Sequence, residues 1–217
     1  ERMVLAGDRV WVTLGHLARD FKHAGPGRLV SLDPVEDAVV QVLDLPGVEN
    51  CAGLLHLPDR ETLYVACAGL FDGGPARQLA GAGLVAVDLS VSPPAVTLLR
   101  GGGDAPGGPF SFDLAVAEGR WLVTVRFGDL AAGTPDRVVA MDLDGDREDV
   151  VIHAAGSAYG IGGVLADDAG GCILVGDADP GAPGILRFRV DGGAFTPDGV
   201  LDAHPSSGLP PRHLAFY

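Results

Sequence analysis

The chain has 217 residues, and its 15 Lys and Arg against 29 Asp and Glu give a formal net charge of −14 at pH 7. This acidity argues against binding to nucleic acid or to anionic lipid, because both present negative phosphates. The 47% hydrophobic content argues against disorder. No apolar run approaches the ~18 residues that a membrane span needs.

An internal repeat runs along the whole chain. One column of apolar segments is centred 53, 58 and 52 residues apart, on Val12, Val65, Val123 and Val175. A second column of apolar segments ends on aspartates 55, 54 and 49 residues apart, namely Asp33, Asp88, Asp142 and Asp191. Two columns with nearly the same period predict a repeat architecture.

Each repeat has the pattern of four short strands. In the second repeat, segments rich in Val, Leu and aromatic residues are separated by Pro, Gly and Asp; the expected strands are 52–57, 62–68, 83–89 and 95–99. No stretch combines helical periodicity with caps at both ends. Four strands per repeat predict an all-β β-propeller. The alternative is a β-sandwich, in which the repeats would share no register.

The repeats predict one propeller domain with four four-stranded blades, at about 1–47, 48–102, 103–156 and 157–205. Residues 211–217 again have the pattern of a first strand. Because the first repeat already contains its own first strand, we expect the chain to be the C-terminal part of a larger ring. A complete four-bladed ring is the alternative.

Two segments of the second repeat resemble a known family. The sequence LYVACAG at 63–69, followed by GLVAVD at 83–88, is similar to the repeat of YncE-like (YVTN-type) propellers. This resemblance implies a ring that is commonly seven-bladed, and a secreted, periplasmic or surface-lipoprotein location. It implies no single activity.

The long connections predict where such a propeller binds. They fall after second strands and between blades, at 15–27, 69–83, 101–109, 128–136 and 206–212. Connections longer than a hairpin turn are frequently functional. We therefore predict a non-catalytic, extracytoplasmic propeller that binds a protein partner or a small ligand on this loop-rich face, without a cofactor.

Polar side chains near the ends of the second strands are the candidate ligand-binding residues. They are His16, Asp72, Arg126, Asp129, Asp177 and Asp179. Convergent carboxylates can hold Ca²⁺ through oxygen ligands. The alternative function is therefore a metal-dependent enzyme of the lactonase or lyase type, whereas the main prediction leaves these carboxylates hydrated and without metal.

Other motifs predict no further chemistry. The spaced aspartates of 142–146 resemble the start of an EF-hand loop, but position twelve is His153, so we expect an Asp-Gly hairpin turn. The six histidines are scattered and no CxxC occurs, which argues against structural zinc. No G-x-S-x-G elbow or P-loop is present.

The cysteines and tryptophans predict specific packing. Cys51 opens a first strand and Cys67 ends the antiparallel second strand, so the hairpin register places them opposite each other, or nearly so, at the same end of the hairpin. We predict a Cys51–Cys67 disulfide, which indicates an oxidising compartment; two buried free thiols are the alternative. Cys172 is predicted to be free and buried. Trp11 and Trp121 occupy similar repeat positions, which predicts packing between blades.

Overall fold

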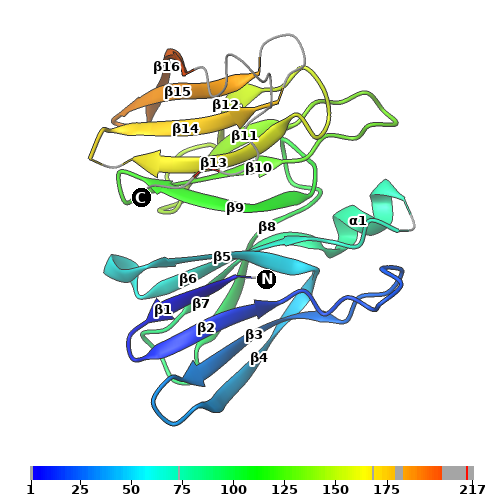
Figure 1. Ribbon diagram of the computed structural model, residues 1–217, viewed down its shortest axis with the longest axis vertical. Coiled ribbons are helices and arrows are strands. Elements are labelled where there is room, and N and C mark those ends of the chain that lie inside the picture. Colours follow the sequence, from blue (N-terminus) through cyan, green and yellow to red (C-terminus); the bar gives the residue numbers. More distant parts are fainter. Residues whose placement is uncertain (1, 73, 168, 179–182, 202–213, 215–217) are drawn as a thin grey trace. The chain divides into compact units, whose positions relative to one another are not determined.

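The computed structural model describes residues 2–72, 74–167, 169–178, 183–201 and 214. These residues form four four-stranded antiparallel sheets, and each sheet is a meander in chain order (Figure 1). This architecture is the predicted all-β propeller. The chain divides into two compact units, unit 1 (Glu1–Phe112) and unit 2 (Asp113–Tyr217). The predicted strand at 211–217 lies outside the described residues, apart from Leu214.

Unit 1 contains two sheets. The first comprises β1 (Met3–Ala6), β2 (Arg9–Leu14), β3 (Pro26–Asp33) and β4 (Ala38–Glu49). The second comprises β5 (Cys51–Leu57), β6 (Thr62–Ala68), β7 (Ala82–Asp88) and β8 (Ala95–Gly101), each within two residues of its predicted bounds. Apolar side chains of β2 and β3 pack against those of β5, β6 and β7, with Leu29, Leu63 and Val65 fully buried.

A short helix, α1 (Pro75–Gly81), lies between β6 and β7 and was not predicted. It has seven residues, which is too short for a helical repeat of apolar residues to stand out, and its only sequence signal is a proline in the first turn. A 3₁₀ turn at Pro58–Arg60 occupies the predicted hairpin turn between β5 and β6. None of the helices in the described residues is long and apolar enough to cross a membrane.

Unit 2 contains the other two sheets, with β9 beginning at the end of unit 1. The third sheet comprises β9 (Phe110–Ala117), β10 (Trp121–Arg126), β11 (Arg137–Asp142) and β12 (Val150–Ala154). The fourth comprises β13 (Ile161–Asp167), β14 (Cys172–Asp177), β15 (Gly184–Asp191) and β16 (Ala194–Leu201). The turn predicted after Asp142 is present, and the Gly145 amide donates to the Asp142 carbonyl over 3.2 Å.

Both tryptophans pack between successive sheets, as predicted. Trp121 is 1% exposed, and its ring meets Phe195 of β16 edge-on, with the ring centroids 5.8 Å apart. Trp11 is buried in one cluster with Leu54 and Leu63 of the following sheet. Each unit therefore has a tryptophan on the second strand of its first sheet, facing its second sheet. The two differ in position along the strand, because Trp121 pairs with Asp142, whereas Trp11 pairs with Ser31, two residues before Asp33.

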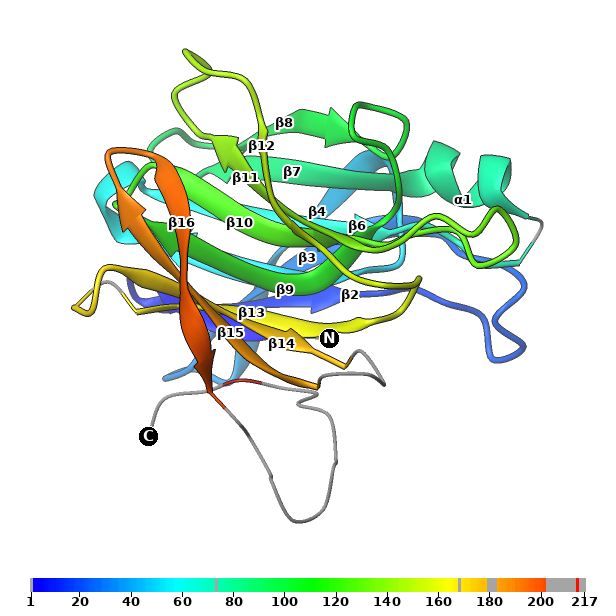
Figure 2. The ribbon, with the colours of Figure 1, turned by 90° about the horizontal axis from the view of Figure 1, so that it is seen from above.

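The two ends of each unit differ. We call the end with the first-to-second and third-to-fourth strand turns the hairpin end, and the other end the loop end. In unit 1 the loop end carries the β2–β3 connection, 15–25, and α1. Both views show the β2–β3 connection and α1 projecting from the same end of unit 1 (Figures 1 and 2).

Candidate functional site

The loop end of unit 1 is held together by a disulfide. Cys51 and Cys67 are cross-strand partners in the β5–β6 hairpin and are bonded, as the register predicted. Asn50, with a φ of 53°, donates from its side-chain amide to the Gly69 carbonyl over 3.1 Å. Gly27 lies so near that a Cβ there would collide with Cys51 Sγ. The strand ends that carry the loops are thus locked to one another.

The two projecting segments of unit 1 are also fixed internally. The β2–β3 connection folds back on itself through an isolated bridge between Leu17 and Ala24. On α1, Arg77 donates to Glu49 over 2.8 Å, and this hydrogen bond together with the Glu49 charge raises the pKa of Arg77. The loops therefore present a defined surface.

Two predicted ligand-binding residues, His16 and Asp72, lie at this loop end. His16 is exposed, has a φ of 53°, and places Nδ1 3.2 Å from the Pro26 carbonyl oxygen. Asp72 is exposed on the connection between β6 and α1. Their function as ligand-binding residues stays a prediction.

In unit 2 a buried carboxylate, Asp136, organises the loop end. Asp136 is fully buried; its Oδ1 accepts from the amides of Gly128 and Tyr159 over 2.8 and 2.9 Å, and its Oδ2 from the amide of Ile161 over 3.1 Å. One side chain thereby ties the β10–β11 connection to the β12–β13 connection. Sequence analysis missed Asp136, because amide partners that lie 23 and 25 residues away leave no local pattern.

Asp129, another predicted ligand-binding residue, closes its own turn. Its Oδ1 accepts from the amides of Ala131 and Ala132 over 2.8 and 3.2 Å, and its own amide donates to Thr134 Oγ1 over 2.7 Å. Such bonds are typical of aspartate in turns. The carboxylate predicted to face a ligand is at least partly engaged by its own loop.

The remaining predicted residues end strands of unit 2. Arg126 ends β10 and is 1% exposed, and Asp177 ends β14 and is 6% exposed. Asp177 Oδ2 lies 2.8 Å from His153 Nε2, a contact from β14 to β12 of the other sheet. Sequence analysis did not select His153, since nothing in the sequence joins these two strands. Asp179 lies outside the described residues.

The carboxylates are therefore dispersed among structural partners. Among the residues that the structure describes, no three His, Cys, Asp or Glu side chains are grouped so as to hold a metal ion. Asp129 and Asp136 accept backbone amides, and Asp177 faces an imidazole. The Ca²⁺ site stays a prediction.

Large apolar side chains are exposed on the connections at the loop end of each unit. In unit 1, Phe21 is 69% exposed and Phe71 is 49% exposed. In unit 2, Leu130 is 72% exposed and Tyr159 is 52% exposed. The Tyr159 ring leans on Phe127 at 5.5 Å, and partial burial, followed by the nearby Asp136 charge, raises the pKa of Tyr159. Sequence analysis named three of these four loops but not these residues, whose signal is a large apolar residue in a Gly- and Pro-rich segment.

Comparison with known proteins supports the fold. Neither a family model nor a curated protein matches the sequence. A putative 6-phosphogluconolactonase from Bacteroides uniformis is similar, with a TM-score of 0.59, 15% identity, and coverage of 93% of this chain and 57% of that chain. A chain of the nidogen/laminin complex matches with a TM-score of 0.55 and 16% identity, covering 85% of this chain and 61% of that chain.

A third solved structure is the soluble aldose sugar dehydrogenase of Escherichia coli. Its TM-score is 0.57 at 13% identity, and the match covers 91% of this chain and 71% of that chain. At such identities the likeness shows the propeller fold alone. The present chain spans about three fifths of the nidogen/laminin and lactonase chains.

Proposed function

We propose that this chain is a non-catalytic, extracytoplasmic propeller of the YncE-like type that binds a partner protein through its loop ends. The observation that carries the proposal is the set of exposed apolar side chains on internally fixed loops. The alternative form of this proposal is a small ligand at the same loop ends. Such a ligand would be bound by the predicted polar residues and not by the exposed apolar side chains.

The apolar tips have the chemistry of interface residues. Aromatic side chains are enriched in protein interfaces, and a few of them supply most of the binding energy. Phe21 and Phe71 expose about half or more of their surface to water. Covering them with a partner removes apolar area from water, which is favourable at roughly 25 cal/mol per Å² before the costs of association.

The fixed loops strengthen this argument. Ordering a mobile loop on binding consumes part of the interaction energy. The Cys51–Cys67 disulfide and the Asp136 hydrogen bonds order the loop bases before any partner arrives. Because the loop bases are already ordered, a partner of complementary shape loses less binding energy in ordering them.

A metal-dependent lactonase- or lyase-type enzyme is the second candidate. The observation in its favour is the contact of 2.8 Å between His153 and Asp177, since a carboxylate that orients an imidazole is a common arrangement for a general base. Structures named as a 6-phosphogluconolactonase and a periplasmic gluconolactonase share the fold. A Ca²⁺-dependent rise in melting temperature, lost in Asp177→Asn, would favour this candidate over the first.

Paired variants test the binding proposal. The double variant Phe21→Ser, Phe71→Ser removes both apolar tips of unit 1, while Val35→Ser removes an 86% exposed valine from the hairpin end of the same unit. Extracellular extract from the source cells is cross-linked to immobilised protein, and bound proteins are quantified by mass spectrometry. We expect a partner retained by Val35→Ser and reduced about tenfold or more, over 1.4 kcal/mol, in the double variant. Equal capture by both variants, or no saturable partner, overturns the proposal.

The extracytoplasmic location has its own test. A disulfide persists in oxidising compartments and is rare in reducing ones. Alkylation of the protein isolated from its cells without reductant should modify only Cys172. Three modified cysteines would place the chain in a reducing compartment.

A further inference from the structure

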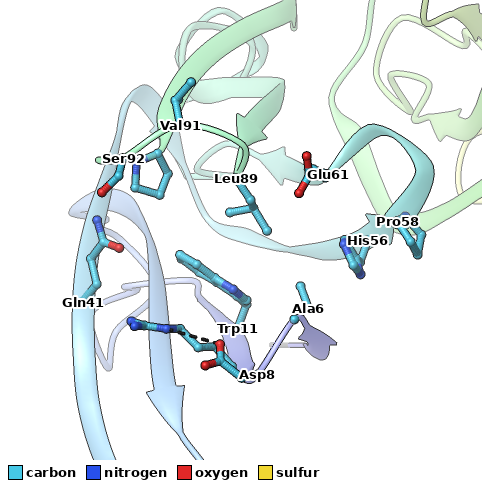
Figure 3. A pocket seen from close by; sticks show the side chains of 13 residues that line it. Ala6, Asp8, Trp11, Gln41, His56, Pro58, Glu61, Leu89, Val91 and Ser92 are labelled. Carbon is cyan, nitrogen blue, oxygen red and sulfur yellow. Dashed lines mark ion pairs between the residues drawn. The ribbon is translucent and has the colours of Figure 1, made fainter.

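A pocket lies at the hairpin end of unit 1, away from the loops (Figure 3). Its volume of about 490 Å³ is within the range of small-molecule sites. Trp11 and Leu89 supply apolar wall, whereas Asp8, His56 and Glu61 bring polar groups to it (Figure 3). The pocket therefore combines an aromatic ring with two carboxylates.

At the hairpin end of unit 2, the space around the second-strand tryptophan is filled by the protein itself. Over the Trp121 ring lie two guanidinium groups, that of Arg147 at 5.8 Å and that of Arg120 at 6.0 Å from the ring centroid. The backbone of Gly193 lies against the ring so closely that a Cβ would collide with it. Phe195 meets its edge. In unit 2, guanidinium groups, a glycine turn and an aromatic ring therefore fill the space around the tryptophan.

The closure in unit 2 depends on a fastened turn. Glu118 accepts hydrogen bonds from the amides of Gly192 and Gly193 over 2.9 and 3.1 Å, and Arg147 donates to the Gly192 carbonyl over 2.9 Å. In unit 1 the corresponding β7–β8 turn contains Pro93 and Pro94, which have no amide hydrogen to donate. These two positions cannot donate the amide hydrogen bonds that Gly192 and Gly193 donate in unit 2.

The two units also differ in the number of positive charges near the tryptophan. In unit 2, the β11–β12 connection, 143–149, supplies Arg147 as a second guanidinium beside Arg120. In unit 1, the corresponding connection, 34–37, contains no basic residue. Among the described residues that line the pocket, Arg9 is the single guanidinium; it lies 3.7 Å from Asp8, and Glu61 adds a further carboxylate. Unit 1 has the ring, the space and the carboxylates, but one cation fewer.

We propose that the pocket beside Trp11 binds a guanidinium-type cation supplied from outside the chain, either a free small molecule or an arginine side chain of a peptide. The cation faces the indole, as Arg147 does in unit 2, and the carboxylates of Asp8 and Glu61 supply the opposite charge. The site lies at the other end of unit 1 from the proposed protein-binding loops, so the two proposals stand or fall separately.

The two tryptophans allow a direct test by NMR. The chain has two indole N–H signals, which Trp121→Phe assigns. N-acetylarginine amide is titrated into the protein, with N-acetylcitrulline amide as the neutral control of equal shape. We expect a saturable shift of the Trp11 signal with a dissociation constant of about a millimolar, and at least about fivefold weaker binding of citrulline. An unmoved Trp11 signal, or equal binding of citrulline, overturns the proposal.

Charge variants place the site. Glu61→Gln should weaken binding of the arginine amide about threefold or more, and Asp8→Asn should act in the same direction. Glu148→Gln makes the same charge change in unit 2 and should leave the affinity unchanged. Equal weakening by Glu61→Gln and Glu148→Gln would mean that only net charge acts, which contradicts the site. A short arginine peptide that binds more tightly than the amide identifies a peptide as the source, and equal affinity identifies a small molecule.

Discussion

Unit 1 and unit 2 are built from the same strand pattern but secure their two ends differently. At the loop end, unit 1 uses the Cys51–Cys67 disulfide, whereas unit 2 uses the buried carboxylate of Asp136. At the hairpin end, unit 1 leaves a pocket beside Trp11, whereas unit 2 covers Trp121 with arginines and a glycine turn. The apolar strand columns set the sheets, and the connecting residues decide which ends are available to bind. Binding sites are therefore expected where the connections of the repeats diverge.

The closed end of unit 2 is centred on one carboxylate. The Asp142 side chain is fully buried, and Arg120 donates to both of its oxygens over 2.7 Å. The amides of Asp146 and Arg147 donate to it as well. These bonds hold the β11–β12 connection so that Arg147 reaches the Trp121 ring. In unit 1 the corresponding aspartate, Asp33, likewise accepts the amides of Val35 and Glu36 over 2.9 and 3.1 Å, but the connection that it closes, 34–37, carries no arginine.

The largest effect expected from this difference is on stability. Trp121→Ala should lower the free energy of unfolding by about 5 kcal/mol and Trp11→Ala by about 3 kcal/mol, the upper and lower parts of the range for such truncations. Trp121 is packed on every side, whereas Trp11 already borders a pocket into which neighbours and water can move. Denaturant unfolding followed by circular dichroism measures both values. Equal losses of unfolding free energy in the two variants would show that the pocket does not reduce the cost of removing Trp11.

The loop ends provide the next largest effect. The double variant Cys51→Ser, Cys67→Ser opens a crosslink with a sequence separation of 16, for which chain entropy gives a loss of about 3 kcal/mol. A reductant should destabilise the wild-type protein by the same amount and leave the double variant unchanged. Cys172→Ser is the matched control, because the Cys172 thiol is unpaired in the structure. A reductant effect that persists in the double variant would assign it to another cause.

The features that the sequence predicts correctly are local or periodic. The hairpin register predicts the disulfide to within one residue. Leu57 pairs with Thr62, so simple counting places Cys51 next to the position opposite Cys67, and a register shift between Cys51 and Gly53 makes the two cysteines direct partners. The strands follow from the valine and aspartate columns. Cys172 was expected to be buried and is half-buried, because it lies at the first position of β14, and this partial burial raises the pKa of its thiol.

The candidate site could be predicted only in part, for a physical reason. The loops are visible as Gly- and Pro-rich insertions, but the bonds that shape them join distant connections. Asp136 contacts Ile161, and His153 contacts Asp177 in another sheet. These pairs depend on how successive sheets pack, which no local pattern encodes. The sequence makes Asp129 a candidate ligand because it does not show the hydrogen bonds by which this side chain closes its own turn.

The stability contributed by Asp142 at the hairpin end of unit 2 should depend on pH. Hydrogen bonds from Arg120, followed by those from backbone amides, outweigh burial and hold the pKa of Asp142 well below its ordinary value of 3.8. A lowered pKa means that this carboxylate stabilises the fold above about pH 4 and that the contribution is lost as the pH falls through the folded-state value. The melting temperature of the wild type should therefore exceed that of Asp142→Asn at pH 7, and the gap should shrink below pH 4.

Asp146→Asn is the control for this pH series. The Asp146 carboxylate is 75% exposed and lies 3.5 Å from Arg120, so its removal should change the melting temperature little at any pH. A gap between wild type and Asp142→Asn that stays constant down to pH 2 would contradict a charge-based role for Asp142.

The variant with the smallest expected effect on stability tests the comparison of the two units most directly. Arg147→Ala removes one guanidinium from the Trp121 ring and one hydrogen bond to Gly192, and should lower the free energy of unfolding by about 1 kcal/mol. The variant makes unit 2 resemble unit 1, so N-acetylarginine amide should now shift the Trp121 indole signal and restore part of the lost stability. Arg189→Ala, which removes a 68% exposed arginine, should permit neither change. If the amide leaves Trp121 unaffected in Arg147→Ala, the arginine over Trp121 is no precedent for a cation beside Trp11, and the pocket of unit 1 would need a different ligand.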